Sequence, residues 1–469
     1  MQDFTNTICA LSTPYGNGAI ALIRVSGSNA ISITDSVVEF PIKSKKLISQ
    51  KTYTSHYGRI KYKNEYLDEV LVNVFKAPHS YTGEDTLEIS CHGSVYIQQK
   101  ILEILIEKGA RMANPGEFTL RAFMNGKLDL SQAEGVADLI ASTTESSHRL
   151  AYQQMRGGFS KEINKLRYEL LNFTTLIELE LDFSEENVEF ADRKKLLKLI
   201  DQIYKLFDSL IKSFEYGNAI KNGIPVAIIG RTNSGKSTLL NRLLHDDKAI
   251  VSAIAGTTRD FIEDTMILKG IQYRFIDTAG IRHTKNQIEA EGVQRTFKKF
   301  NEAAIVIVLI DINEELLEVN KSFEFLRNND PTGKYIILAL NKIDQLKESI
   351  IQAKLLEYKS FWSKYAYIIG ISAKDGINIE KLEDLLVSNT INKISTENEI
   401  VVTNVRHFEA LKRSSLALQR VREGLMNSLT TDMLAMDIRE VLHYLGEITG
   451  EITTDEILGN IFKNFCIGK

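Results

Sequence analysis

The spacing of apolar residues changes character several times along this chain. Within residues 1–118, apolar runs of strand length occur at Ile20–Val25 and Glu69–Phe75. The segment Val95–Glu107 instead repeats apolar residues every three or four positions, and Gly109 follows it as a helix stop. This mixture predicts an α/β domain over residues 1–118.

A helical pattern dominates two later stretches, residues 119–216 and residues 390–469. Glycine and proline are nearly absent between Phe159 and Glu215, which favours a run of long helices. Apolar positions recur there every three or four residues and form one face. The positions on this face are Leu196, Leu199, Ile203, Phe207, Leu210 and Phe214.

Between these stretches, residues 217–389 alternate apolar runs of strand length with helical segments. Such alternation is typical of a parallel sheet flanked by helices. We therefore predict an α/β domain inserted between the two halves of a split helical domain, since the termini of a domain often lie close together. The runs are Pro225–Gly230, Tyr273–Asp277, Ala304–Ile310 and Tyr335–Asn341.

Composition agrees with a multidomain globular protein. The 469 residues are enough for about three domains, with 43% hydrophobic and 25% charged residues. The net charge of −4 provides no global attraction to nucleic acid. Cys9, Cys91 and Cys466 are too few and too far apart for a disulfide framework or a zinc site. Without a signal peptide or membrane-spanning run, the chain is expected to be cytoplasmic.

The first chemical motif is Gly230–Ser237, which reads GRTNSGKS. It follows the predicted strand Val226–Ile229 and precedes the helical segment Thr238–Leu244, the context that a phosphate-binding loop requires. Backbone N–H groups of such a loop and the helix N-terminus face the phosphates. Lys236 is expected to contact the β- and γ-phosphates, and the Ser237 hydroxyl to bind Mg²⁺.

Two further segments complete the predicted phosphate site. The sequence DTAG at Asp277–Gly280 ends a strand, so that Asp277 is expected to reach Mg²⁺ through water and the Gly280 N–H to sense the γ-phosphate. The segment Gly256–Asp260 lies between the two motifs, and we assign its Thr258 to Mg²⁺. The alternative for this segment is an ordinary polar turn.

Base selection is predicted from Asn341–Asp344, which reads NKID after a strand. The Asp344 carboxylate can accept hydrogen bonds from N1–H and the exocyclic amine of guanine, a donor pair that adenine lacks. A backbone amide of Ser372–Lys374 can donate to guanine O6. Four motifs in this order predict a domain that binds and hydrolyses GTP, similar to the translation-factor-related GTPases. However, Ile281 stands where Ras-like proteins carry a water-orienting glutamine.

The chain as a whole resembles the tRNA modification GTPase MnmE (TrmE) family. The resemblance runs from end to end and includes the terminal CIGK sequence. The segments that carry it outside the GTPase domain are Thr13–Gly27, Ser80–Gly93, Asn114–Phe123, Asn125–Leu130 and Cys466–Lys469.

This resemblance implies a potassium ion in place of an arginine finger. Asn233 matches the family's potassium-binding asparagine, and Ser252–Thr257 matches the loop that wraps the ion with carbonyls. Thr232 and Ser252 depart from the usual Pro and Thr, but neither change removes a carbonyl or the asparagine side chain. The implied potassium ligands are Asn233, Ser252, Ile254 and Thr257.

The resemblance also makes Glu289 the catalytic residue that orients the attacking water, together with Lys236 in the phosphate loop. Judged by the residues alone, Glu289 is a solvated acid or no better a candidate than Glu291. The predicted GTP-binding residues are Asn233, Ser234, Gly235, Lys236, Ser237, Thr238, Ser252, Ala253, Ile254, Ala255, Gly256, Thr257, Thr258, Asp277, Thr278, Ala279, Gly280, Asn341, Lys342, Asp344, Ser372, Ala373 and Lys374.

For the N-terminal domain the resemblance implies dimerisation and a site for 5-formyltetrahydrofolate or a related one-carbon tetrahydrofolate. Arg24, Glu88, Lys127 and Lys469 match the folate-contacting residues. Cations suit the glutamate tail of folate, and a carboxylate suits the donor face of its pterin ring. Cys466 matches a thiol that the family needs for tRNA modification. Without the resemblance, these side chains would be read as solvated charges and an exposed tail thiol.

The implied activity is modification of tRNA by a homodimer. With an FAD-dependent partner, MnmG (GidA), in a heterotetramer or larger complex, it would add an aminomethyl or carboxymethylaminomethyl group to C5 of the wobble uridine. The alternative is a ribosome-assembly or translation GTPase that acts only as a binding switch. Binding of formyltetrahydrofolate discriminates between the two, because a pure switch needs no such pocket.

Overall fold

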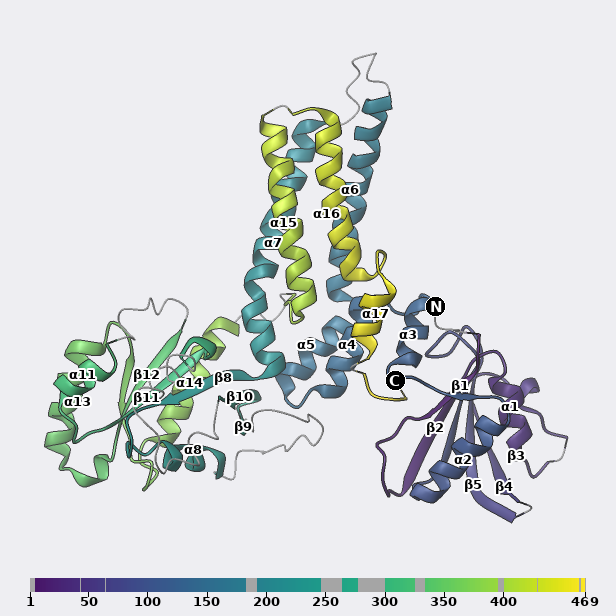
Figure 1. Cartoon of the computed structure of the whole chain (residues 1–469), viewed down its shortest axis with the longest axis horizontal. Coiled ribbons are helices and arrows are strands. Elements are labelled where there is room, and N and C mark those ends of the chain that lie inside the picture. Colours follow the sequence, from purple (N-terminus) through teal and green to yellow (C-terminus); the bar gives the residue numbers. More distant parts are fainter. Residues whose placement is uncertain are drawn as a thin grey trace. The chain divides into compact units, whose positions relative to one another are not determined.

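In the computed structural model the chain forms two compact units. Figure 1 labels most of their helices and strands. Met1–Ala141, Ala151–Phe207 and Glu409–Lys469 form the first, and Ser142–Leu150 with Asp208–Phe408 form the second. No helix within the described residues is long and apolar enough to cross a membrane. The structure describes residues 5–42, 44–63, 65–182, 192–245, 264–276, 300–324, 334–394, 400–427, 429–463 and 465–468.

The first unit begins with a seven-stranded sheet in the order β3-β4-β5-β6-β2-β1-β7. Its neighbours are antiparallel except for β1 and β7. Alternate strand residues such as Ile23, Val72 and Ile89 are completely buried and form the core with the helices. The predicted strands and helix of this region are confirmed. The elements are β1 Ile8–Leu11, β2 Ile20–Ser26, α1 Ala30–Val37, β3 Val38–Glu39, η1 Leu47–Ser49, β4 Thr54–Tyr62, β5 Glu65–Phe75, β6 Thr86–His92, α2 Val95–Glu107 and β7 Arg111–Met112.

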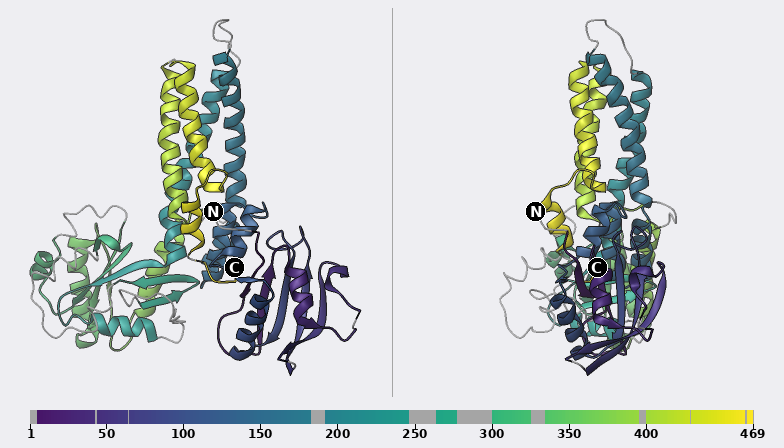
Figure 2. Two further views of the ribbon diagram at one scale, coloured as in Figure 1. Left: turned by 45° about the vertical axis from the view of Figure 1, so that its right-hand side comes forward. Right: turned by 90° about the vertical axis from the view of Figure 1, so that its right-hand side faces the viewer.

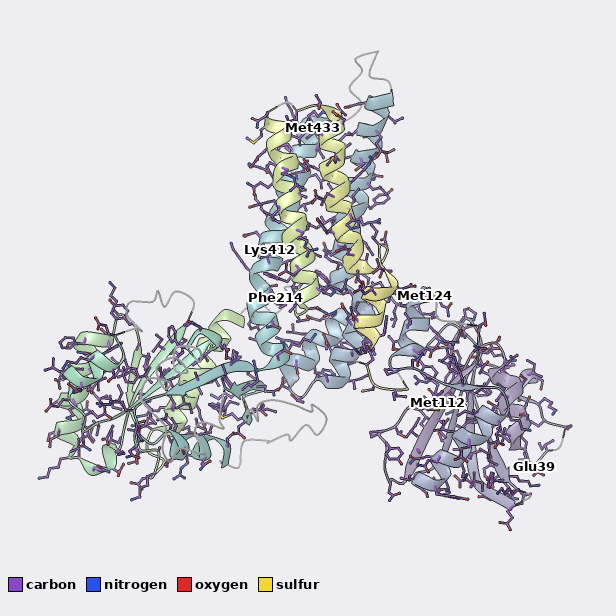
Figure 3. All side chains as sticks on the ribbon, viewed as in Figure 1. Glu39, Met112, Met124, Phe214, Lys412 and Met433 are labelled. Atoms are coloured by element: carbon purple, nitrogen blue, oxygen red, sulfur yellow. The ribbon has the colours of Figure 1, made fainter. Side chains whose placement is uncertain are left out.

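Long helices follow, and others return at the end of the chain. Helix α16 packs beside α6, and the left view of Figure 2 shows the two helices next to each other. On α7 the predicted apolar face is buried at Leu196, Ile203 and Phe207, whereas Phe214, labelled in Figure 3, is half-buried. Its ring stacks on that of Phe408, with centroids 4.3 Å apart. The helices are α3 Glu117–Met124, α4 Leu130–Ala141, α5 Glu145–Met155, α6 Gly158–Asp182, α7 Arg193–Asn222, α15 Val405–Met426, α16 Thr431–Thr449 and α17 Asp455–Phe462.

The second unit contains a six-stranded sheet in the order β13-β12-β11-β8-β10-β9. Strands β13 to β10 are parallel, and β9 is antiparallel at the edge. Successive residues of the central strands enter two cores, one on each face, which explains their continuous apolar runs. The predicted α/β domain within a helical domain is thus confirmed. The elements are β8 Ile224–Ile229, α8 Lys236–His245, β9 Asp264–Leu268, β10 Ile271–Phe275, β11 Ile305–Asp311, α11 Leu316–Ser322, β12 Tyr335–Asn341, η3 Ile343–Gln345, α13 Glu348–Trp362, β13 Tyr367–Gly370 and α14 Ile379–Ile394.

Candidate functional site

The loop between β8 and α8 is shaped by close backbone approaches. Asn233 and Gly235 have φ angles of 65° and 100°, in the left-handed region. A Cβ atom on Gly235 would lie 2.3 Å from Nδ2 of Asn341, and one on Gly230 would lie 2.3 Å from the carbonyl oxygen of Leu309. Glycine is therefore required at both positions, and the loop curls as a phosphate cradle must.

Lys236 begins α8 and bends back over this loop. Its Nζ donates to the carbonyl oxygens of Gly230 at 2.9 Å and Arg231 at 2.8 Å. Phosphate oxygens are stronger acceptors than carbonyls because they carry charge. The phosphate oxygens of a bound triphosphate could therefore replace the two carbonyl oxygens as partners of the ammonium group.

Asn341 connects three loops at the carboxyl edge of the sheet. It ends β12 and is buried. Its Nδ2 donates to the carbonyl oxygen of Ser234 at 2.8 Å, and its Oδ1 accepts from the N–H of Ala373 at 2.9 Å. Through these bonds Asn341 holds the phosphate loop and the loop after β13 against its own motif.

The neighbouring residues leave one carboxylate open to solvent. Lys342 has a left-handed φ of 69°, and its Nζ lies 2.6 Å from Oδ2 of Asp311. Burial alone would raise the pKa of Asp311, but hydrogen bonds from Lys342 and Asn313 outweigh it and hold this pKa below its usual value. Asp344 in η3 is exposed to solvent.

The loop after β13 is held from two sides. The Ser372 hydroxyl is buried and accepts from the N–H of Asp375 at 3.1 Å. From α8, Arg242 donates to the carbonyl oxygens of Ala373, at 3.4 Å, and Lys374. These bonds link the helix that follows the phosphate loop to the predicted base-binding loop.

A second candidate site lies on the sheet of the first unit. Arg24 on β2 is the cross-strand partner of Glu88 on β6, and its Nε and Nη2 lie 3.1 and 2.8 Å from Oε1 of Glu88. The two side chains are only 11% and 19% exposed. The guanidinium also lies 5.4 Å from the ring centroid of Tyr81 and 5.6 Å from that of Phe118. A partly buried ion pair with aromatic neighbours is thus preformed.

The C-terminal tail reaches the same place. The carbonyl oxygen of Gly468 accepts from Nη1 of Arg24 at 3.2 Å and from Oγ of Ser12 at 3.3 Å. Cys466, two residues earlier, is exposed. Lys127 donates instead to the carbonyl oxygen of Pro78, at 3.0 Å. The structure therefore brings Arg24, Glu88 and the tail together.

Close to this site a buried ion network joins α3 to the loop before β6. Arg121 is 1% exposed and pairs with Glu84 and Glu117, both at 3.0 Å. Burial pushes the pKa of Glu117 up, but hydrogen bonds from Arg111, Asn114 and Arg121 leave it below the usual value. Because a buried charge without its partner costs far more than an exposed one, we expect this network to fix α3 on the sheet.

Comparison with known proteins agrees with these features. Residues 7–127 match the family described as GTP-binding protein TrmE N-terminus, and residues 130–466 match the MnmE helical domain. The tRNA modification GTPase MnmE of Bacteroides thetaiotaomicron is 53% identical over 465 residues, which cover 99% of both chains. That of Parabacteroides distasonis is 54% identical over 469 residues, covering 99% of this chain and 100% of the relative. The chain belongs to the MnmE family of tRNA modification GTPases.

Among solved structures, the chain is similar to a variant of Era from Aquifex aeolicus bound to GDP.AlF4−. The identity is 27%, over 41% of this chain and 66% of Era, with a TM-score of 0.28. Membership of the MnmE family, a family of GTPases, rests on the full-length relatives instead. The resemblance stated from the sequence motifs is therefore confirmed.

Several predicted residues lie outside the part of the chain that the structure describes, so their roles stay predictions. They belong to the potassium loop, the magnesium segment, the DTAG motif, the water-orienting position and the chain end. These residues are Ser252, Ala253, Ile254, Ala255, Gly256, Thr257, Thr258, Asp277, Thr278, Ala279, Gly280, Ile281, Glu289, Glu291 and Lys469.

Three residues that lie at the two candidate sites were not predicted from the sequence. Asp311 ends β11 at the carboxyl edge of the sheet. Ligands bind at this edge in open α/β sheets, so the position of Asp311 after an apolar strand was a usable signal. Arg242 belongs to no motif, and only the fold shows that it contacts the base loop. Ser12 carries no chemical signal of its own, since its partner in the tail is 456 residues away.

Proposed function

We propose that this member of the MnmE family is a GTPase that modifies tRNA. With the FAD-dependent partner MnmG, it adds an aminomethyl or carboxymethylaminomethyl group to C5 of the wobble uridine. The observation that carries the proposal is the identity of more than 50% with MnmE proteins across the whole chain. Two chemically different sites support it, one of the phosphate-loop type and one built on Arg24 and Glu88.

For hydrolysis, Lys236 neutralises charge on the β- and γ-phosphates. Ser237 at the start of α8 is the residue that would hold Mg²⁺, which would supply charge neutralisation at the phosphates. Asn233 is exposed and has a left-handed φ of 65°. This exposure suits a ligand of K⁺, which would take the task of an arginine finger. Glu289 then orients the attacking water.

The Arg24–Glu88 pair suits a one-carbon tetrahydrofolate. Both bonds from Arg24 end on a single oxygen of Glu88, Oε1. The Glu88 carboxylate, held by Arg24, is an acceptor for the donor face of a pterin, while the cations Lys127 and Lys469 suit the acidic tail. We include the homodimer, the larger complex with MnmG, and the division into domains 1–118, 119–216, 217–389 and 390–469 in the proposal.

The rival function, a ribosome-assembly or translation switch, shares the GTPase domain but has no use for a folate site. The deciding experiment has two parts. Titration of the purified protein with 5-formyltetrahydrofolate should show saturable binding that Arg24→Ala and Glu88→Ala weaken. Nucleoside analysis of tRNA from a deletion strain should show loss of the modified wobble uridine. Unchanged tRNA nucleosides would overturn the proposal in favour of the switch.

A further inference from the structure

Gly468 packs tightly against the backbone at the end of β1. Gly468 is buried and has a φ of +94°, which residues with side chains rarely adopt. A Cβ atom there would lie 2.3 Å from the carbonyl oxygen of Leu11 and 2.9 Å from Cα of Ser12. Both atoms belong to backbone, which cannot swing away. Only glycine therefore fits at this position.

The carbonyl of Gly468 is held by two donors. Nη1 of Arg24 and Oγ of Ser12 both lie within 3.3 Å of its oxygen. Arg24 uses Nε and Nη2 for Glu88, so one guanidinium bridges the candidate ligand site and the tail. A bond from a charged donor in a poorly hydrated place is stronger than a neutral one.

A second anchor precedes the first by three residues. Phe465 packs edge-on against Phe462 with ring centroids 5.0 Å apart. A Cβ atom on Gly116 would lie 3.0 Å from Cβ of Phe465, so α3 begins directly against the tail. The N–H of Gly116 also donates to the carbonyl oxygen of Cys466 at 3.4 Å. The exposed thiol thus lies on a short span between two fixed points.

We propose that Gly468 locks the C-terminal tail onto β1 and β2. Gly468 and Ser12 thereby act as positioning residues for Cys466. Because Arg24 binds both the tail and Glu88, docking of the tail is coupled to occupancy of the ligand site. None of these residues needs to touch a reacting atom to do so. The coupling rests on the proposed tetrahydrofolate function, whereas the lock does not. By thermodynamic reciprocity, a ligand that favours the docked tail must itself bind more tightly when the tail is docked.

The lock is tested by tryptic release of the tail from the purified full-length protein. Lys463 is exposed, and cleavage after it frees the segment that starts at residue 464. Mass spectrometry follows this peptide specifically. When trypsin is limiting, so that the tail opens and closes faster than it is cut, the rate reports the open fraction of the tail. Gly468→Ala should raise the rate at least about tenfold, and Ser12→Ala should raise it less, because only one bond is lost.

Gly459→Ala is the matched control. Gly459 lies in α17 of the same terminal segment, and a Cβ there meets nothing within 4 Å. Its release rate should stay within about twofold of the parent, since only helix propensity changes. Melting curves of all three variants check that they fold. Equal release rates in Gly468→Ala and Gly459→Ala would overturn the lock.

The coupling is tested by adding 5-formyltetrahydrofolate to the same assay. Release should slow in the parent and in Gly459→Ala, and Gly468→Ala should bind the folate more weakly. Binding to the parent without any effect on release would overturn the coupling and leave the lock standing. Absence of folate binding to the parent would overturn the folate function and the coupling, while the ligand-free rates still decide the lock.

Discussion

The two candidate sites of this chain are assembled in different ways. In the second unit, each predicted group follows a strand within one contiguous motif, and Asn341 joins the motifs by hydrogen bonds to Ser234 and Ala373. In the first unit, Arg24 meets Gly468 across a sequence separation of 444 residues. A site made of local motifs depends on the spacing of residues within each motif, whereas a site made of distant segments depends on how those segments dock. Substitutions at the first kind of site should therefore change GTP turnover, and substitutions at the second kind should not.

The largest expected effect on GTP turnover comes from Lys236→Ala. Removing the ammonium group takes away a charge-assisted contact to the β- and γ-phosphates, so binding should weaken by about a hundredfold or more and turnover should nearly vanish. Titration with a fluorescent GTP analogue and a phosphate-release assay measure the two effects. Lys381→Ala, an exposed lysine on α14, is the control and should behave like the parent. Parental activity in Lys236→Ala would show that this loop is not the phosphate site.

Next comes Asp344→Asn, which should change the choice of base. Two charge-assisted hydrogen bonds to guanine are lost, worth roughly 3 kcal/mol, or about a hundredfold in GTP affinity. An amide can instead donate to the O2 of xanthine, so XTP should now compete better than GTP. Competitive binding of the two nucleotides measures the switch. Unchanged GTP affinity would remove Asp344 from the base site.

A smaller effect is expected when sodium replaces potassium. Na⁺ is smaller and should fit a cage of carbonyls and the Asn233 side chain poorly, so turnover should fall at least about tenfold. Phosphate release at matched ionic strength in the two chloride salts tests this. Asn233→Ala should lose the difference between the salts. Equal rates in the parent would overturn the predicted preference for potassium over sodium.

The smallest effect on GTP turnover is predicted for Cys466→Ser, which should leave it near the parental value. The same variant should strongly reduce wobble-uridine modification in complemented cells, measured by mass spectrometry of tRNA. A thiol and a hydroxyl are similar in size, so repacking is a poor explanation for a residue with an exposed side chain. If tRNA modification were normal, the thiol would have no functional role.

The two other cysteines sharpen this last experiment. Burial raises the pKa of Cys9 to about 12, and burial followed by the nearby Asp68 carboxylate raises that of Cys91 to about 11. Both stay protonated at pH 8, because their folded pKa values lie well above it. Alkylation of the folded protein at pH 8 should therefore label Cys466 alone.

Periodicity and spacing alone determined much of this protein. The apolar runs around Val226, Ile307 and Leu338 predict a sheet buried on both faces, because strands covered by helices on each side have no polar face. The motif at Gly230–Ser237 is recognised from its spacing and from the strand and helix beside it, although Leu309 and Asn341, both distant in sequence, also require its glycines. The family resemblance likewise rests on contiguous segments such as Asn125–Leu130 and Cys466–Lys469, which are recognisable without the fold.

Only the tertiary structure decided how distant residues combine. Nothing in the sequence pairs Ser12 with Gly468, or Arg242 with the loop after β13, because such contacts depend on how whole elements pack. The requirement for glycine at position 468 likewise comes from a backbone, that of Leu11, at the other end of the chain. Local propensity carries no information about a neighbour so distant in sequence. The requirement for glycine arises only in the folded state, where the backbone of Leu11 sterically excludes a side chain.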